Sequence, residues 1–337
     1  MRGFMPFIPC ILGCILALCV SVGSYAAEPV KKAHPSVDIQ NKANFEDAEF
    51  SLKINDIVMP YSVFSVFVMP NEAVEFEVLY AQSKRSYSFI NNHSNATLTD
   101  TNRWQWQAPK KPGLTRVIIE SPDKKQRMTI NVFVKVPADE VQGGKLKYYH
   151  IGHYPTPSQI KDSKHYIVPD GFVKVTPENE NIKISPHFSL KEFVSKQRSK
   201  HPKYLFLQNK LLLKLEKIRK ELILENIPVK NMVVMSGYRT PYYNKAIGNV
   251  KLSRHVFGDA ADIFIDNDGD YRMDDINNDG KHSIGDAQAM AGIVESLAKR
   301  ESFKGLLGGL GVYGPKSHRG AFIHVDTRGF KARWVSK

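Results

Sequence analysis

The sequence predicts an α+β protein in two parts: an all-β domain, then a domain of mixed strands and helices. From about residue 45 to 136, short β-prone runs alternate with turn residues and no amphipathic helix interrupts them. From residue 182 onward, strand-like and helix-like patterns are mixed. The stretch 138–181 between them is rich in Pro and Gly, which predicts a linker.

The first part reads as a small β-sandwich over residues 40–137. Its runs include YSVFSVFVMP, AVEFEVLYA, TRVIIES and MTINVFVKVP. Strands of this length at roughly ten-residue spacing are typical of immunoglobulin-like sandwiches. Trp104 and Trp106 are two residues apart and therefore share one strand face. We expect this domain to position or bind and not to catalyse.

The second part, residues 182–337, contains a clear succession of elements. Ser189 can cap a short helix that begins with LKEF, and Tyr204 to Glu225 repeats apolar residues at spacings of three and four, which predicts an amphipathic helix. The elements that follow are a strand in NMVVMSGYR, a strand in GDAADIFID, a helix in DAQAMAGIVESLAKR and a final strand in GAFIHVDTRG.

The first 27 residues have the form of a secretory signal peptide. Arg2 precedes a long apolar run, which ends at small residues including Ala26 and Ala27. We expect cleavage there, export to the periplasm or cell surface, and no stable membrane span afterwards. The alternatives are a retained membrane anchor, or lipidation at Cys14 in ILGC, although that cysteine lies inside the apolar run.

The formal net charge of +13 predicts an anionic partner. Export makes anionic cell-envelope polymers better candidates than nucleic acid. The alternative is that basicity only keeps the protein soluble. All three cysteines fall within the signal segment, so a cleaved chain would have no thiol or disulfide and would depend on packing and bound metal.

Three residues in the second part have the chemistry of a metal site. His255 precedes a turn at Gly258, Asp262 follows on a predicted strand, and His324 lies in FIHVD. Two imidazoles and one carboxylate leave a fourth tetrahedral position open, which is typical of catalytic zinc and not of closed structural zinc. The spacing of His255 and Asp262 alone carries little weight.

Three ordered motifs strengthen this interpretation: SGYRTPYYN, SRHVFGDAADIFI and GAFIHVDTRGFKARW. Together with ISPHFSLKEF they resemble the zinc D-alanyl-D-alanine carboxypeptidases and murein endopeptidases, which are related to the lysostaphin-type peptidases. The resemblance covers roughly residues 182–334. It implies a small antiparallel sheet flanked by helices, a zinc ion held by His255, Asp262 and His324, and a peptidoglycan peptide as substrate.

Zinc in such a site would lower the pKa of its water toward ~7 and so supply a nucleophile for a peptide carbonyl. Much of the family carries an acidic residue three positions before the last ligand histidine, but this chain has Ala321 there. Asp326 is the candidate base, or the residue that orients an imidazole, since it shares the strand face of His324. His318 is the other candidate for base or transition-state donor.

Arg239 of SGYR is the candidate for substrate binding. Its guanidinium could hold a substrate carboxylate or the developing oxyanion, as the resemblance implies. The alternative is a salt bridge that braces the loop. Ser236, Tyr238 and Asn244 are expected to shape the pocket.

The acidic loop 266–286 contains a calcium-type pattern in DINNDGKHSIGD. Oxygen ligands at alternating positions can wrap a hard cation, while Gly280 permits the sharp turn and Lys281 offers its backbone carbonyl. The side-chain ligands expected for calcium are Asp275, Asn277, Asp279, Ser283 and Asp286. Asp266, Asp268 and Asp270 read as a solvated acidic loop.

Three functions therefore compete. The first is a zinc peptidase that hydrolyses D-amino-acid peptide bonds in peptidoglycan. The second is a non-catalytic cell-wall binding protein that keeps the metals, which the alanine at 321 favours. The third is a calcium-dependent adhesive module whose histidines are incidental, and it predicts a protein without zinc.

Overall fold

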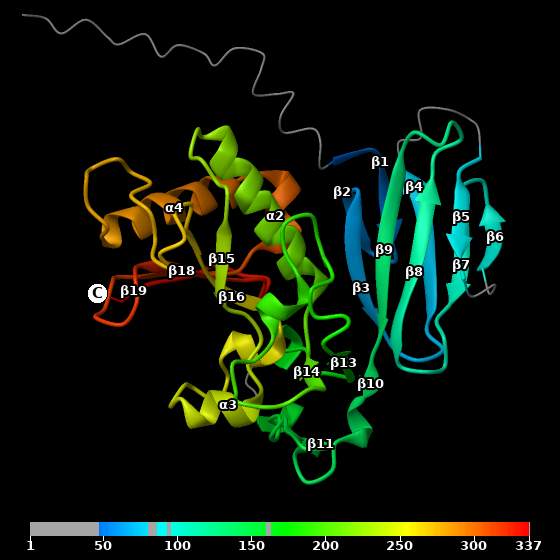
Figure 1. The fold of residues 1–337 in the computed structure, drawn as a ribbon, viewed down its shortest axis with the longest axis horizontal. Helices are drawn as coiled ribbons and strands as arrows, with labels where there is room; N and C mark the ends of the chain where they lie inside the picture. The colour runs from blue at the N-terminus through cyan, green and yellow to red at the C-terminus, as the bar shows by residue number, and fades with distance from the viewer. Residues whose placement is uncertain (1–46, 80–85, 93–95, 160–162, 337) are drawn as a thin grey trace, which may run out of the picture. The chain divides into compact units, whose positions relative to one another are not determined.

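The computed structural model of the chain describes residues 47–79, 86–92, 96–159 and 163–336 (Figure 1). The predicted signal peptide, with its three cysteines, lies outside these residues. The described residues form a mixed α and β structure and belong to one compact unit. Within the described ranges, no helix is both long and apolar enough to cross a membrane.

The first part consists of two β-sheets. One has the strand order β2-β1-β4-β7-β6, and the other has the order β3-β9-β8-β5. The strands of the first sheet are β1 (Asp47–Ile54), β2 (Ile57–Tyr61), β4 (Ala73–Leu79), β6 (Ala96–Asp100) and β7 (Arg103–Gln107). Those of the second are β3 (Val63–Val68), β5 (Ser88–Asn91), β8 (Gly113–Glu120) and β9 (Arg127–Val134).

Aromatic side chains join these two sheets. The ring of Phe89 on β5 lies 5.3 Å from that of Phe76 on β4 and 5.6 Å from that of Trp104 on β7. Trp104 and Trp106 are both buried, as expected for alternate residues of one strand face. The pairs are antiparallel except β3 with β9, which run parallel. An antiparallel pattern was expected, and this pair departs from it.

Residues 138–181 are more structured than the predicted linker. β10 (Val136–Pro137), β13 (Gly171–Val175) and β14 (Lys203–Leu205) form a three-stranded sheet. The hairpin of β11 (Lys145–Leu146) and β12 (Tyr149–His150) lies between, with short 3-10 turns at Ala138–Glu140, Pro157–Gln159 and Ser163–His165. Buried side chains explain the order, among them Tyr149, Ile151 and Phe172.

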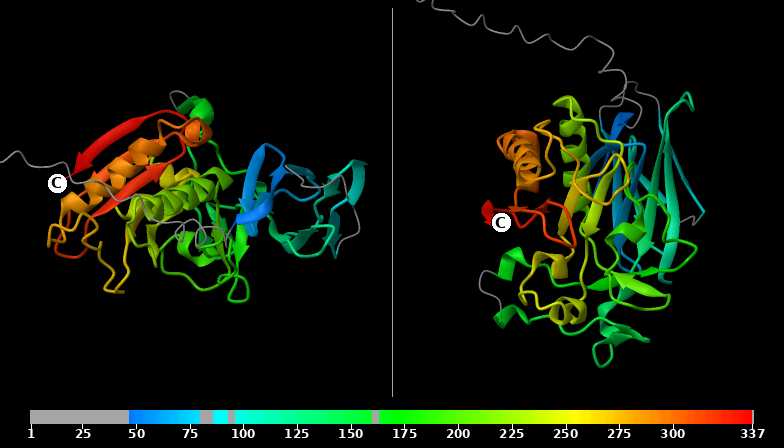
Figure 2. Two further views of the ribbon diagram at one scale, coloured as in Figure 1. Left: turned by 90° about the horizontal axis from the view of Figure 1, so that it is seen from above. Right: turned by 60° about the vertical axis from the view of Figure 1, so that its left-hand side comes forward.

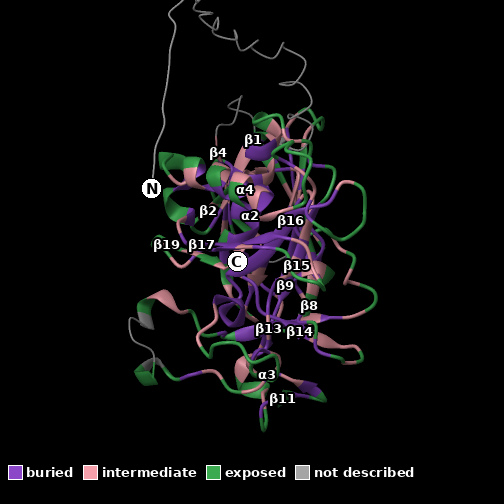
Figure 3. Ribbon diagram, turned by 90° about the vertical axis from the view of Figure 1, so that its left-hand side faces the viewer, coloured by how far each residue is buried: buried purple, intermediate pink, exposed green. Residues whose placement is uncertain are grey.

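A five-stranded sheet in the order β15-β16-β18-β17-β19 forms the centre of the second part. Its strands are β15 (Met232–Ser236), β16 (Ala260–Ile265), β17 (Gly309–Tyr313), β18 (Phe322–Asp326) and β19 (Ala332–Ser336). All pairs are antiparallel except β17 with β19. β16 and β18 are buried along their whole length (Figure 3).

Helices pack on one another and on two strands of this sheet. α4 (Ile284–Leu297) packs on β17 and β18, and α2 (Asn209–Leu224) packs on α4 and on the 3-10 turn Glu301–Leu306 (Figure 2). α3 (Pro241–Ala246) and the 3-10 turns Leu190–Phe193 and Arg254–Phe257 complete the second part.

Some predicted elements need correction. The amphipathic helix expected from Tyr204 begins only at Asn209, because Lys203–Leu205 instead pairs with β13 as a strand. β18 is not the final strand, since β19 follows it. The capping box at Ser189, with Glu192 reaching back to its backbone, is present as the sequence indicated.

Candidate metal centre

The structure brings His255, Asp262 and His324 together. The Oδ1 atom of Asp262 lies 3.2 Å from Nε2 of His255 and 3.0 Å from Nδ1 of His324. The two imidazole nitrogens are 3.2 Å apart. Three buried side chains thus direct one potential ligand atom each to a common point, and the three atoms lie within 4.8 Å of one another. This donor set fits a zinc ion.

The backbone explains how residues so far apart in sequence meet. Asp262 on β16 and His324 on β18 are directly paired in the antiparallel register. His255 comes from the 3-10 turn before β16, which ends at Gly258 in the left-handed region with φ of 67°. A side chain at Gly258 would also place its Cβ 2.5 Å from the Phe206 carbonyl oxygen, so glycine is required there.

In each imidazole, the outward nitrogen, which is the one that does not face the common point, makes a hydrogen bond of its own. Nδ1 of His255 lies 2.7 Å from the Gly237 carbonyl oxygen, and Nε2 of His324 lies 3.2 Å from Oδ2 of Asp326. Because a carbonyl and a carboxylate accept hydrogen bonds, both outward nitrogens carry protons. The inward nitrogens are then free to bind a cation, as in most zinc sites.

Electrostatics favour a neutral His255 and an ionised Asp262. For His324, burial is outweighed by the hydrogen bonds to Asp262 and Asp326, which raise its pKa. Burial lowers the pKa of His255 below its ordinary value, which keeps the imidazole neutral. Burial alone would raise the pKa of Asp262, but His255 and His324 outweigh it, and the pKa lies well below the usual range. The centre therefore presents an ionised carboxylate, the form that binds metal ions.

Asp326 orients His324 and is not placed to act as the general base. Its side chain is fully buried, and its oxygens accept hydrogen bonds from the Gly309 backbone N–H at 2.7 Å and from Nε of Arg328 at 2.9 Å. Burial would raise its pKa, but His324 and Arg328 hold it below the ordinary value. With its lone pairs engaged, Asp326 has little capacity to take a proton from water.

Arg239 lies beside the metal centre. Its Nη2 donates to Oδ2 of Asp262 at 2.6 Å, and its Nε donates to the Ser236 hydroxyl at 2.9 Å. The side chain is 12% exposed and lines the cavity over the centre. The guanidinium is thus held by the site itself, with a face toward the space where a substrate would lie.

The other sequence candidates lie elsewhere. His318 is exposed in the turn between β17 and β18 and does not line the cavity, so the base predicted there is not supported by geometry. Ala321 is buried and apolar. Tyr238 is buried and shares a 2.7 Å hydrogen bond with the Tyr154 hydroxyl.

The cavity over the centre has a volume of about 450 Å³, and much of its wall escaped sequence reasoning. Trp334 of β19 lines it, with its ring centroid 5.2 Å from that of His324 and its Nε1 donating to the Tyr313 hydroxyl at 2.8 Å. The other unforeseen wall residues are Tyr166, Asn249, Val250, Leu252, Ser253, Arg254, Tyr313, Phe322 and Arg328. Trp334 is part of the motif GFKARW, and this motif was the only sequence feature that associated it with the site.

Residues of the predicted calcium loop make internal hydrogen bonds. Asp275 accepts from the backbone N–H groups of Asp279 and Gly280, at 3.1 and 2.7 Å. Asp286 is fully buried and caps α4, accepting from the Ser283 N–H at 2.8 Å. The described acidic residues that gather within ligand distance are Asp266, Asp268 and Asp274 instead. Calcium binding at 275–286 stays a prediction.

Comparison with known proteins agrees with this chemistry. Residues 186–286 match the family model described as Peptidase M15. The matched stretch includes Arg239, His255 and Asp262, and it stops before His324. The match supports a zinc-dependent metallopeptidase of the M15 group. The chain matches no curated protein.

Proposed function

We propose that the protein is an exported zinc peptidase that hydrolyses D-amino-acid peptide bonds in peptidoglycan, either at stem-peptide ends or in cross-links. The observation that carries the proposal is the convergence of His255, Asp262 and His324, with both outward imidazole nitrogens already hydrogen-bonded. The M15 match in the same part of the chain supports it.

Each residue has a defined task in this proposal. His255, Asp262 and His324 hold the zinc ion, which when bound supplies Lewis-acid activation of water and of the peptide carbonyl. Asp326 fixes the ring of His324, and Arg328 fixes Asp326. Arg239 binds the substrate carboxylate or the developing oxyanion, because a guanidinium offers two parallel donors to such groups.

The net charge of the chain supports an anionic peptide as substrate. Arg239, Arg254 and Arg328 line the cavity with aromatic rings, and each is paired with a buried aspartate, so the attraction comes from the strongly basic chain as a whole. A basic surface concentrates such a protein on the anionic cell envelope by long-range attraction. We propose that the sandwich domain helps to retain the protein at the cell envelope.

The direct test is release of peptide fragments from purified sacculi, with and without a zinc chelator. We expect fragments only without the chelator, and expect the chelated sample to recover on addition of zinc. Mass spectrometry of the released muropeptides then separates loss of a terminal D-alanine from opening of a cross-link. Sacculi that remain intact under zinc-loaded conditions would rule out the hydrolase.

One observation favours a second candidate, a cell-wall binding protein that retains the metal. Among the described residues that line the cavity, Asp262 is the only carboxylate, and position 321 is alanine. A protein without a proton acceptor would bind without cutting. Sedimentation with sacculi that leaves no soluble fragments, and that weakens in the variant Arg239→Ala, would identify this function.

A further inference from the structure

A second cavity of about 350 Å³ adjoins the metal-centre cavity. Asn249 lines both, and the segment after it divides them: Lys251 and Val256 face the second cavity, while Leu252 and His255 face the first. A substrate bound at the metal centre can therefore extend past this segment into the second cavity.

Close packing of the β11–β12 hairpin region on α3 forms the second cavity. The Tyr242 N–H donates to the Ile151 carbonyl at 3.0 Å, and the His150 ring stacks on the Tyr242 ring with centroids 4.5 Å apart. A Cβ on Gly152 would lie 2.5 Å from the Tyr242 nitrogen, so the two backbones meet directly. The walls are fixed in advance of any ligand.

One wall residue carries an unpaired hydrogen-bond acceptor. Asn244 is 2% exposed and lines the second cavity. Its Nδ2 donates to the Val250 carbonyl at 2.9 Å, which fixes the orientation of the amide. Its Oδ1 has no partner among the described residues. This oxygen has almost no solvent-accessible surface, so Asn244 holds the wall in place and other residues make the contacts with a ligand.

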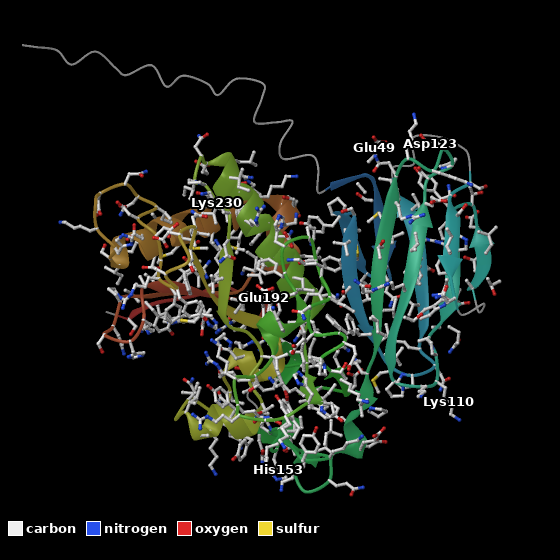
Figure 4. All side chains as sticks on the ribbon, in the orientation of Figure 1. Glu49, Lys110, Asp123, His153, Glu192 and Lys230 are labelled. Carbon is white, nitrogen blue, oxygen red and sulfur yellow. The ribbon has the colours of Figure 1, made fainter. Side chains whose placement is uncertain are left out.

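The charge around the second cavity selects an anion. Lys245, Lys251 and His153 line it and are exposed at its rim, and Figure 4 labels His153 beside the hairpin. None of its described lining residues is acidic. The exposed face of the Tyr242 ring, 47% exposed as a residue, adds an apolar platform.

We infer that the second cavity binds a carboxylate-bearing peptide segment of the substrate, outside the bond that is cleaved. A peptide supplies both features at once: carboxylates for Lys245 and Lys251, and an apolar group for the Tyr242 ring. The inference rests on the proposed peptidase function and deepens it. A substrate that occupies both cavities is a peptide of several residues.

The test compares the double variant Lys245→Gln/Lys251→Gln with a matched control, Lys110→Gln/Lys111→Gln. The control removes the same charge at exposed positions between β7 and β8, where Figure 4 labels Lys110. Two probes are used with the full chain: a stem peptide with free carboxylates and the same peptide with its carboxylates amidated. Binding is measured by calorimetry with a chelator present, and KM and kcat are measured with zinc.

We expect the cavity variant to bind the free-carboxylate peptide about 10-fold more weakly, with KM raised by a similar factor and kcat unchanged. The amidated peptide and the control variant should show no such change. Equal weakening in both variants, or no weakening in either, would overturn the inference. If no variant cleaves any peptide but the binding difference persists, the peptidase proposal fails while the anionic peptide site stands.

Discussion

Asp262 and His324 face each other as direct partners across β16 and β18. In an antiparallel pair, directly opposed residues send their side chains to the same face, so the register alone sets two ligands side by side. A slip of one residue would move one of them to the opposite face. The relative positions of these two ligands are therefore fixed by the register of two fully buried strands.

This arrangement predicts the effect of removing any ligand. His255→Ala, Asp262→Ala and His324→Ala should each abolish zinc retention and peptidase activity, because two remaining ligands hold the ion loosely. Metal analysis after gel filtration checks this, with circular dichroism as the control for folding. Full zinc content in any one folded variant would remove that residue from the site.

The hydrogen bond between Asp326 and His324 predicts that a change at Asp326 weakens zinc binding without abolishing it. Asp326→Asn keeps the shape of the side chain but loses the charge that fixes the imidazole, so zinc affinity should fall about 10- to 100-fold while the chain still folds. Competition with a zinc-binding dye gives the affinity. The control is Asp270→Asn, in an exposed loop. Identical affinities in the two variants would mean that Asp326 only braces Arg328.

Arg239 predicts a defect in turnover. Arg239→Lys retains a positive charge near Asp262 but cannot donate to Asp262 and Ser236 at once and still face a substrate. We expect a folded, zinc-containing protein with kcat/KM reduced at least ~10-fold. Unchanged steady-state kinetics on muropeptides would show that the arginine has a structural role only.

The motif resemblance named three candidate ligands that the structure brings together, and the sequence pattern predicted the order of the main elements around them. His255 and Asp262 are joined by a short turn, and the strands β16 and β18 are apolar apart from Asp262, His324 and Asp326, so local pattern predicts both strands. The strand β19 was missed because its parallel pairing with β17 depends on contacts distant in sequence. Trp334, which it carries into the cavity, was missed with it.

The segment 138–181 shows a different limit of sequence reasoning. Its Pro and Gly content suits a linker, but it suits equally a chain that packs irregularly against a domain. Tyr166 lines the cavity and lies over the Arg254 guanidinium at 4.6 Å, a contact across nearly ninety residues that no local pattern encodes. Neither candidate base could be judged from sequence, because the engaged lone pairs of Asp326 and the position of His318 outside the cavity are set by tertiary contacts.

A buried lysine predicts a pH dependence of stability. Lys214 on α2 is 2% exposed, and its Nζ donates to the Asp326 carbonyl at 2.7 Å. Burial lowers its pKa to about 8, although Asp326 opposes this shift. Between pH 8 and the ordinary lysine value near ~10.4, the unfolded chain binds a proton that the folded chain has released, so this group makes stability rise with pH across that window.

The contribution of Lys214 can be isolated with Lys214→Met. Urea unfolding at pH 7.5 and 10.5 should show a rise of up to about 3 kcal/mol in the free energy of unfolding of the parent relative to the variant. Lys210→Met, at an exposed position on the same helix, is the control and should behave as the parent. An equal pH response in the parent and in Lys214→Met would contradict the prediction.

The last prediction concerns calcium and the loop that joins β16 to α4. Asp275 and Asp279 lie in this loop and Asp286 in the first turn of α4, so an ion that neutralises them would remove their mutual repulsion and tie the loop to the helix. Binding to the folded state alone stabilises it by mass action. Millimolar calcium should therefore raise the melting temperature, and Asp275→Ala with Asp279→Ala should abolish the rise while zinc still binds.

Asp268→Ala is the informative control, because Asp268 belongs to the neighbouring group with Asp266 and Asp274. If Asp268→Ala abolishes the rise and the double variant does not, the ion binds upstream of the predicted loop, and a melting curve that calcium does not move would leave both acidic groups without a metal.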